Sequence, residues 1–232
     1  VFQDGDHIVF DRENIKAPEV YRDVCPTEAL TVVGEDRSIT DIMEEVRADV
    51  PFYNKSGGGL TVSGGEPYMQ ADSVAALFRA ARDSGINTCV ETSLYASFEQ
   101  IKKSLPYTDY ILADIKHVDL YKYKAGTGGN LKVVLNNLRD LADFEGTIRA
   151  RVPVIPGFND TYDELNAIIA YVSELPHIHA IDFLSYHTLG KAKYTYLGGE
   201  YNYPGIPEHT KHFLEEFIQH TADTDLTVTI GG

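Results

Sequence analysis

The chain has 232 residues, of which 43% are apolar, enough to bury one substantial core as a single domain. Its formal net charge of −15 argues against a nucleic-acid or anionic-membrane surface, because phosphate groups are bound by clustered Lys and Arg. Two cysteines are too few for a disulfide framework, and neither a signal peptide nor an apolar run of membrane-spanning length is present, so we expect a cytoplasmic protein.

The amino-terminal segment combines a hairpin signal with part of a metal motif. Residues 7–10 alternate between turn signals and predict a small surface hairpin. Cys25-Pro26 matches the end of the ferredoxin-type run Cys-x-x-Cys-x-x-Cys-x-x-x-Cys-Pro. Counted back from Cys25, the other three cysteine positions of this motif are occupied by Ile15, Pro18 and Tyr21, and none of these side chains can bind iron. We therefore expect Cys25 to be a buried small hydrophobe.

From residue 38 onward, helical and strand patterns alternate. Ser38-x-x-Asp41 resembles a capping box, and the helix that it opens is expected to end near Pro51. Further helices are predicted to start at Pro67 and after Ser97, Asn130 and Thr161. Strands are predicted at 60–62, 87–92, 109–116, 148–155 and 180–185. Such parallel crossover units form a barrel or a doubly wound sheet, and the periodicity does not choose between them.

Residues 56–67, Ser-Gly-Gly-Gly-Leu-Thr-Val-Ser-Gly-Gly-Glu-Pro, predict a strand that ends in a bend at a binding site. Gly64 and Gly65 remove Cβ where the backbone must turn sharply or lie against a ligand. Neither a phosphate-loop ending nor a dinucleotide fingerprint is present. The bend offers the anion Glu66 and exposed carbonyls, a combination that prefers an ammonium group to a phosphate. A plain connecting loop is the alternative.

Polar and ionisable residues recur where the predicted strands end. In a parallel barrel or sheet these ends lie at one edge, where ligands bind. Any one of them taken alone could equally be solvated surface or, for His187, a structural histidine. The residues are Ser63 to Glu66, Glu91 to Ser93, Asp114, Lys116, Arg151 and His187.

The segment 56–67 closely resembles the signature of glycyl radical enzyme activating enzymes, the radical S-adenosylmethionine group that includes the pyruvate formate-lyase activating enzyme. Four further motifs follow in the family's order, so that the resemblance spans roughly residues 25–203. They are Glu91-Thr92, Asp114-Ile115-Lys116, Arg151 to Gly157, and Tyr186 to Lys191.

The resemblance implies an α/β fold, a partial TIM-like (β/α)6 barrel of parallel strands. The barrel would occupy residues 38–232, with its first strand missing from this sequence. Residues 1–37 would be a degenerate ferredoxin-like insert whose cluster ligands are lost.

The resemblance also implies a cofactor site for S-adenosylmethionine. The Gly-Gly-Glu element ending at Glu66 would bind the amino group of the cofactor, Lys116 would approach its carboxylate, and His187 would contact it. Glu91 and Asp114 would hold a monovalent cation, although the family has a shorter acid at the first position, which changes the expected geometry. No residue is assigned as a catalytic acid or base. The full cofactor set is Ser63, Gly64, Gly65, Glu66, Thr92, Ser93, Lys116, Arg151 and His187.

The implied activity is hydrogen abstraction from a glycine of a partner glycyl radical enzyme. In the family, one electron from a [4Fe-4S] cluster cleaves S-adenosylmethionine to methionine and a 5′-deoxyadenosyl radical. A flavodoxin- or ferredoxin-type protein would donate that electron. No nucleic acid or membrane is expected as a partner.

The family's Cys-x-x-x-Cys-x-x-Cys cluster motif is absent from this sequence. By the family's order it would lie before Val1, so the chain is either a truncated activating enzyme or a natural protein that lost its chemistry. We favour truncation because an inactive relative would have little reason to retain Glu66, Asp114, Lys116 and His187 together. The chain alone is expected to be inactive.

Two other functional classes remain open from the sequence. One is a non-catalytic barrel that binds S-adenosylmethionine or a similar small amino-acid-like ligand, which cofactor affinity without a recoverable cluster would favour. The other is an ordinary barrel enzyme with Lys116 as a Schiff-base nucleophile, which borohydride trapping of a carbonyl substrate would reveal.

Overall fold

The computed structural model describes residues 2–5, 7–9, 34–197, 199–201, 207–221 and 224–231, with isolated positions before residue 34. The chain divides into two compact units, residues 1–42 and 43–232. Most of the expected 1–37 insert, including Cys25 and Pro18, lies outside the described residues.

The first unit contains the predicted hairpin. Strands β1 (Phe2–Asp4) and β2 (His7–Val9) pair antiparallel, with Phe2 opposite Val9. Gly5 lies in the turn with a φ of 58°, a conformation that a residue without Cβ adopts at low cost. The hairpin prediction is confirmed.

Two helices precede the main sheet. At the start of α1 (Ile39–Ala48), the amide of Asp41 donates to Ser38 Oγ and the amide of Ser38 to the Asp41 carboxylate, which confirms the capping box. Helix α1 ends at Ala48, which confirms the predicted end near Pro51. A second helix, α2 (Val50–Ser56), follows directly, because proline fits the first helical turn, where its missing N–H removes no hydrogen bond.

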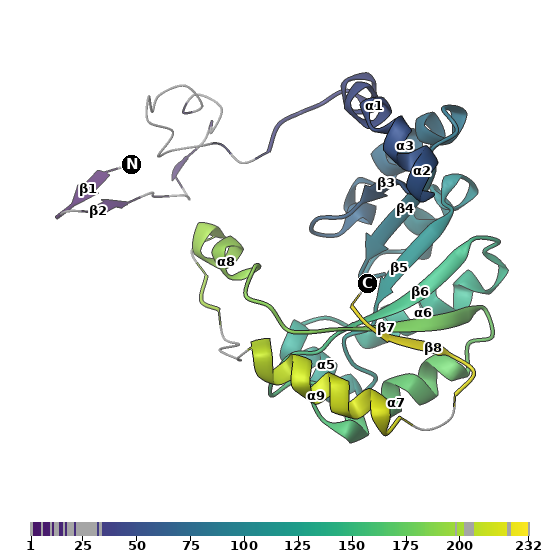
Figure 1. Ribbon diagram of the computed structural model, residues 1–232. Coiled ribbons are helices and arrows are strands. Elements are labelled where there is room, and N and C mark those ends of the chain that lie inside the picture. Colours follow the sequence, from purple (N-terminus) through teal and green to yellow (C-terminus); the bar gives the residue numbers. More distant parts are fainter. Residues whose placement is uncertain are drawn as a thin grey trace. The chain divides into compact units, whose positions relative to one another are not determined.

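Six parallel strands form one sheet whose order in space follows the sequence (Figure 1). A doubly wound sheet would reverse direction at its centre, whereas sequential order without reversal is that of a barrel. Among the described residues, β3 and β8 do not pair with each other, so the sheet stays open, as the partial-barrel prediction requires. The strands are β3 (Gly59–Val62), β4 (Asn87–Thr92), β5 (Tyr110–Asp114), β6 (Thr147–Pro153), β7 (Ile178–Leu184) and β8 (Thr227–Ile230), the last of which the sequence patterns did not predict.

Helices connect these strands. The predicted caps at Asn130 and Thr161 form, while the Ser97 side chain makes no capping bond. Helices α5 (Leu120–Thr127), α8 (Lys191–Leu197) and α9 (Pro207–Gln219) were not predicted; Asp119 caps the start of α5, and Gly128 ends it with a φ of 73°. The other elements are η3 (Pro67–Gln70), α3 (Ala71–Asp83), α4 (Phe98–Lys102), η4 (Leu105–Tyr107), α6 (Leu131–Asp140), η5 (Leu141–Asp143) and α7 (Tyr162–Ser173).

The core lies between the sheet and its helices. Alternate residues of β6 are buried, because successive side chains of a strand point to opposite faces. From the helices, Phe78, Leu138, Ile168 and Phe217 reach the same apolar cluster. Burial of this layer is the main term that stabilises the sheet.

A buried ion pair ties the last three strands together. On β7, Asp182 is 1% exposed and accepts two hydrogen bonds from the Arg149 guanidinium of β6. The Thr229 hydroxyl of β8 donates to the same carboxylate. Three strands are therefore cross-linked by one side chain.

No helix in the described part of the chain is both long enough and apolar enough to cross a membrane.

Candidate functional site

The sheet brings most of the predicted site residues to its carboxyl edge. Ser63 to Glu66 follow β3, Thr92 ends β4 and Asp114 ends β5, while Arg151 lies directly opposite Asp114 in the register of β6. Lys116 comes two residues after β5. These side chains share one edge because the strands are parallel.

Glu66 is fixed by the end of the neighbouring strand. Its Oε1 accepts from the amide of Tyr68, at 3.2 Å, and from Thr92 Oγ1, at 2.7 Å. Its Oε2 accepts from both the amide and the hydroxyl of Ser93. Four donors fill the lone-pair positions that a carboxylate offers. The negative charge of Glu66 thus lies at the bend, but both carboxylate oxygens already accept hydrogen bonds from the protein itself.

A second carboxylate links three strands. Glu91 of β4 accepts from Ser63 Oγ at 2.9 Å through one oxygen and pairs with the Arg151 guanidinium through the other. Arg151 is mostly buried, and its Nε has no hydrogen-bond partner in the described structure. An unsatisfied buried donor costs free energy unless a ligand or water meets it.

Asp114 and Lys116 form a partly buried pair, with Nζ 3.1 Å from Asp114 Oδ2. The other oxygen, Oδ1, is buried without a hydrogen-bond partner among the described residues. Burial raises the pKa of Asp114 above its usual value, and the Lys116 ammonium offsets this only in part. Three groups at the carboxyl ends of β5 and β6 can therefore still bind a ligand atom: Asp114 Oδ1 as an acceptor, Arg151 Nε as a donor and the Lys116 ammonium as a cation.

The glycine bend leaves room beside the backbone. Gly64 has a φ of 133°, which few other residues adopt, and a Cβ built at Gly64 or Gly65 would meet no atom within 4 Å. The chain's own atoms therefore do not require glycine at Gly65. A ligand lying against the backbone would require it.

Among the described residues, His187 is outside this hydrogen-bond network. His187 lies three residues after β7 with an exposed side chain and makes no hydrogen bond to the other site residues within the described structure. Glu91 and Asp114 belong to no group of three or more His, Cys, Asp or Glu side chains that could hold a metal ion in the part of the chain that the structure describes.

Two buried asparagines that the sequence patterns did not single out hold the loops of this edge. Asn159 is fully buried, donates to the carbonyls of Lys116 and Pro153, and accepts from the amide of Ile155. Asn137 of α6 donates to the carbonyls of two residues just after β4. The only sequence signal was that Asn137 falls within the apolar stripe of a predicted helix.

A buried histidine, His117, follows β5 by three residues. The amide of Asp119 donates to His117 Nδ1, so the ring proton is on Nε2, which lies 3.5 Å from the Glu164 carboxylate. Lys122 also contacts Glu164. Burial raises the pKa of Glu164, but hydrogen bonds from Lys122 and Thr161 outweigh it, and the net pKa is lowered. This cluster joins the start of α5 to α7.

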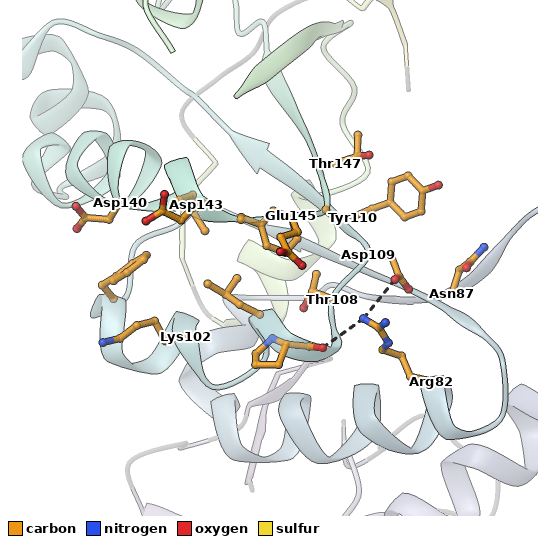
Figure 2. A pocket seen from close by; sticks show the side chains of 16 residues that line it. Arg82, Asn87, Lys102, Thr108, Asp109, Tyr110, Asp140, Asp143, Glu145 and Thr147 are labelled. Atoms are coloured by element: carbon orange, nitrogen blue, oxygen red, sulfur yellow. Dashed lines mark hydrogen bonds and ion pairs between the residues drawn. The ribbon is translucent and has the colours of Figure 1, made fainter. Parts of the chain in front are cut away.

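Two hollows of the described structure lie at the opposite edge of the sheet, and the larger, of about 1000 Å³, is lined by residues at the amino ends of β7 and β8. A cavity of about 760 Å³ opens at the amino ends of β4, β5 and β6. Figure 2 shows Arg82 there, bonded to the Pro106 carbonyl and paired with Asp109, with Asp140, Asp143 and Glu145 farther along the wall. None of the predicted site residues lines it. We place the candidate site at the carboxyl edge, because the buried Asp114 Oδ1 and Arg151 Nε lie there without a hydrogen-bond partner among the described residues.

The cysteines of this chain do not fit a [4Fe-4S] cluster. Three thiolates are required to leave one iron open, and the sequence has two cysteines. Cys89 lies within β4, opposite Thr61, and burial raises the pKa of its thiol. A protonated strand thiol away from the carboxyl edge is a poor iron ligand.

The chain belongs to the radical SAM superfamily, whose family model matches residues 24–171. Within it, the similar curated proteins are activating enzymes of glycyl radical enzymes, which confirms the family predicted from the motifs.

One relative is the choline trimethylamine-lyase activating enzyme of Oleidesulfovibrio alaskensis, 39% identical over 88% of this chain and 67% of the relative. A second is the (2S)-3-sulfopropanediol dehydratase activating enzyme of Klebsiella oxytoca, 39% identical over 85% of this chain and 63% of the relative. The benzylsuccinate synthase activating enzyme of Thauera aromatica is 34% identical over 99% of this chain and 71% of its own length. The chain thus spans about two thirds of these relatives.

A solved structure supports the fold. A domain of the pyruvate-formate lyase-activating enzyme from Bacteroides vulgatus superposes with a TM-score of 0.60 over 75% of this chain and 99% of that domain. At 24% identity this likeness concerns the fold alone.

Proposed function

We propose that this protein is a glycyl radical enzyme activating enzyme that acts on S-adenosylmethionine. Family membership supports the reaction class, and the site at the carboxyl edge supports the cofactor. The curated relatives carry the names of different partner enzymes, so the proposed partner is a glycyl radical enzyme without further specification. An electron-donor protein of the flavodoxin or ferredoxin type and a cytoplasmic location complete the proposal.

The residues of the edge are proposed to hold the amino-acid end of the cofactor. Because four donors occupy the Glu66 oxygens, the carbonyls of residues 63–65 would accept from the ammonium group while Glu66 supplies the compensating charge. Lys116 and the free Nε of Arg151 would meet the carboxylate. Thr92 and Ser93 would act by fixing Glu66, and His187 would contact the cofactor from the loop after β7.

A cation site is proposed beside the carboxylate. The buried Asp114 Oδ1 without a partner and the nearby Glu91 are the ligands offered, and a monovalent ion suits two oxygen donors better than a transition metal does. The cluster that the family's chemistry requires is not assigned to any cysteine of this chain.

The proposal rests on the open space beside Gly64 and Gly65. This space lies at the same sheet edge as the hydrogen-bonded Glu66 carboxylate and as Asp114 Oδ1 and Arg151 Nε, which have no partner among the described residues. The test is calorimetric titration of the chain with S-adenosylmethionine, for which we expect a dissociation constant of about 0.1 to 1 mM, since a few charge-assisted contacts must offset the ordering of the ligand.

The partner is tested separately. Affinity purification of the native protein from anaerobic cells, followed by electron paramagnetic resonance of the co-purified enzyme, should reveal a glycyl radical. Absence of cofactor affinity together with absence of any such partner would contradict the proposal.

A further inference from the structure

The turn that follows β4 contains a strained residue. Leu94 has a φ of 55° and is the only non-glycine residue with a positive φ in the described part of the chain. It is also fully buried. A left-handed conformation brings Cβ of an L-residue against its own backbone, so it persists only where the surroundings enforce it.

The strained conformation arranges the donors that surround Glu66. Thr92 Oγ1 accepts from the Leu94 amide at 2.9 Å, and Ser93 Oγ accepts from the Tyr95 amide at 3.3 Å. These bonds leave both hydroxyl hydrogens and the Ser93 amide free to donate to Glu66. The turn therefore supplies three of the four donors that hold this carboxylate.

One side chain from a distant helix enforces the turn. The Asn137 amide nitrogen donates to the carbonyls of Leu94 and Ala96, both at 2.8 Å, from 43 and 41 positions further along the chain. Asn137 is 4% exposed and lies on α6, whose Leu131, Val134 and Leu138 anchor it in the core. A polar residue on that face is not needed for packing, since an aliphatic side chain would fill a similar space.

We propose that Asn137 is a positioning residue of the cofactor site. It acts through the Ser93–Leu94 turn to fix Glu66, and through Glu66 it sets the Gly64–Gly65 bend. Its role toward cofactor rests on the proposed function, whereas its role in holding Glu66 does not.

The experiment compares Asn137→Leu with Thr88→Val. Thr88 is also fully buried, at the amino end of β4, and the variant loses three hydrogen bonds: the hydroxyl donates to the Tyr107 carbonyl and the Asp109 carboxylate and accepts from the Asp109 amide. Amide hydrogen exchange is read at Ser93 and Tyr68, which donate to Glu66, and at Val90 in β4 as the reference for the strand.

We expect Asn137→Leu to speed exchange at Ser93 and Tyr68 at least tenfold relative to Val90, and Thr88→Val to leave that ratio unchanged. If Asn137→Leu does not fold, Asn137→Ser, which retains one donor, should give a smaller change in the same direction. Equal acceleration at all three amides in either Asn137 variant would overturn the proposal.

Cofactor affinity is the second measurement. Titration with S-adenosylmethionine should be at least fivefold weaker in the Asn137 variant and within twofold of the unmodified chain in Thr88→Val. An unchanged affinity despite faster exchange would overturn the role toward cofactor. If the unmodified chain does not bind, the cofactor part of the proposed function fails, and the exchange data still decide whether Asn137 positions Glu66.

Discussion

At the level of single residues, two aspartates of the sheet differ in how their charge is compensated. Asp182 accepts from Arg149 and Thr229 on both oxygens, whereas Asp114 has a partner on one oxygen and none on the other. Burial raises the pKa of Asp182, but its hydrogen bonds outweigh burial and the net pKa is lowered; that of Asp114 is raised. The two groups should therefore affect stability with opposite signs.

Asp182→Asn should destabilise the protein at pH 7. Removing one member of a buried pair leaves the other charge unpaired, and because about a third of Arg149 remains exposed we expect a loss of about 3 kcal/mol. Since the folded pKa lies below the usual 3.8, the stabilisation is present above that pH and is lost as pH falls through the folded value. Urea unfolding at several pH values should show a shallower acid decline in the variant than in the wild type.

Asp114→Asn should be neutral or slightly stabilising at pH 7. With a folded pKa above 3.8, Asp114 favours the fold at low pH, and this contribution is lost as pH rises through the raised value. The side chain of the Asp114→Asn variant does not ionise, so the variant keeps its free energy of unfolding as the pH rises. The same urea series measures it, with Asp83→Asn on the exposed face of α3 as a control for one unit of charge. A strong destabilisation would contradict the incomplete compensation of Asp114.

Glu66→Gln should weaken both the turn and the cofactor site. The amide NH₂ would face two donors of Ser93, so two hydrogen bonds are lost at a cost of about 1 to 3 kcal/mol. Loss of the charge should weaken S-adenosylmethionine binding about tenfold, since a contact to a charged group is worth about that much. Calorimetry and urea unfolding on the same sample measure both, and Glu99→Gln, 80% exposed on α4, is the control.

At the level of elements, Gly59 and Gly65 lie in the same segment, but glycine is required at the two positions for different reasons. A Cβ on Gly59 would collide with the Asn87 carbonyl, its partner in the β3 and β4 register, whereas one on Gly65 would meet nothing within 4 Å. The first glycine is needed for strand pairing. The second is needed only if something else approaches the bend.

Gly59→Ala and Gly65→Ala should therefore separate stability from binding. Gly59→Ala should cost about 1 to 3 kcal/mol by overpacking, because the strands must move apart. Gly65→Ala should leave the free energy of unfolding within about 0.5 kcal/mol, as for a surface position, yet reduce cofactor affinity by filling the open space. Full affinity in Gly65→Ala would mean that no ligand lies against this glycine.

At the level of the whole molecule, the chain combines the proposed cofactor site with too few cysteines for a cluster. Its two cysteines cannot supply three iron ligands. Ile15, Pro18 and Tyr21 occupy the positions where a ferredoxin-type run would have the others.

Anaerobic reconstitution of the 232-residue chain should therefore yield no cluster. Iron analysis should give far less than four atoms per chain and the absorption band of a cluster should be absent. Cys89→Ser should leave the iron content unchanged. Iron near four atoms per chain, lost in that variant, would show that the thiol of β4 takes part after all.

The sequence by itself determined the strands of the barrel from β3 to β7, the caps of α1, α6 and α7, and the family. These features are local: alternation, capping pairs and glycine positions act within a few residues, and the motifs are contiguous. It also placed the site residues at strand ends, because parallel strands must share an edge.

The tertiary structure decided what those residues do to one another. Helix α5 and strand β8 escaped prediction because their stability comes from packing rather than from a strong local pattern. The decisive hydrogen bonds join residues 26 to 60 positions apart. They are the bond from Thr92 to Glu66, the bonds that connect Ser63, Glu91 and Arg151, and the bond from Asn137 to the Leu94 carbonyl. Hydrogen bonds over such separations depend on the register of neighbouring strands and the seating of α6, which no local pattern encodes.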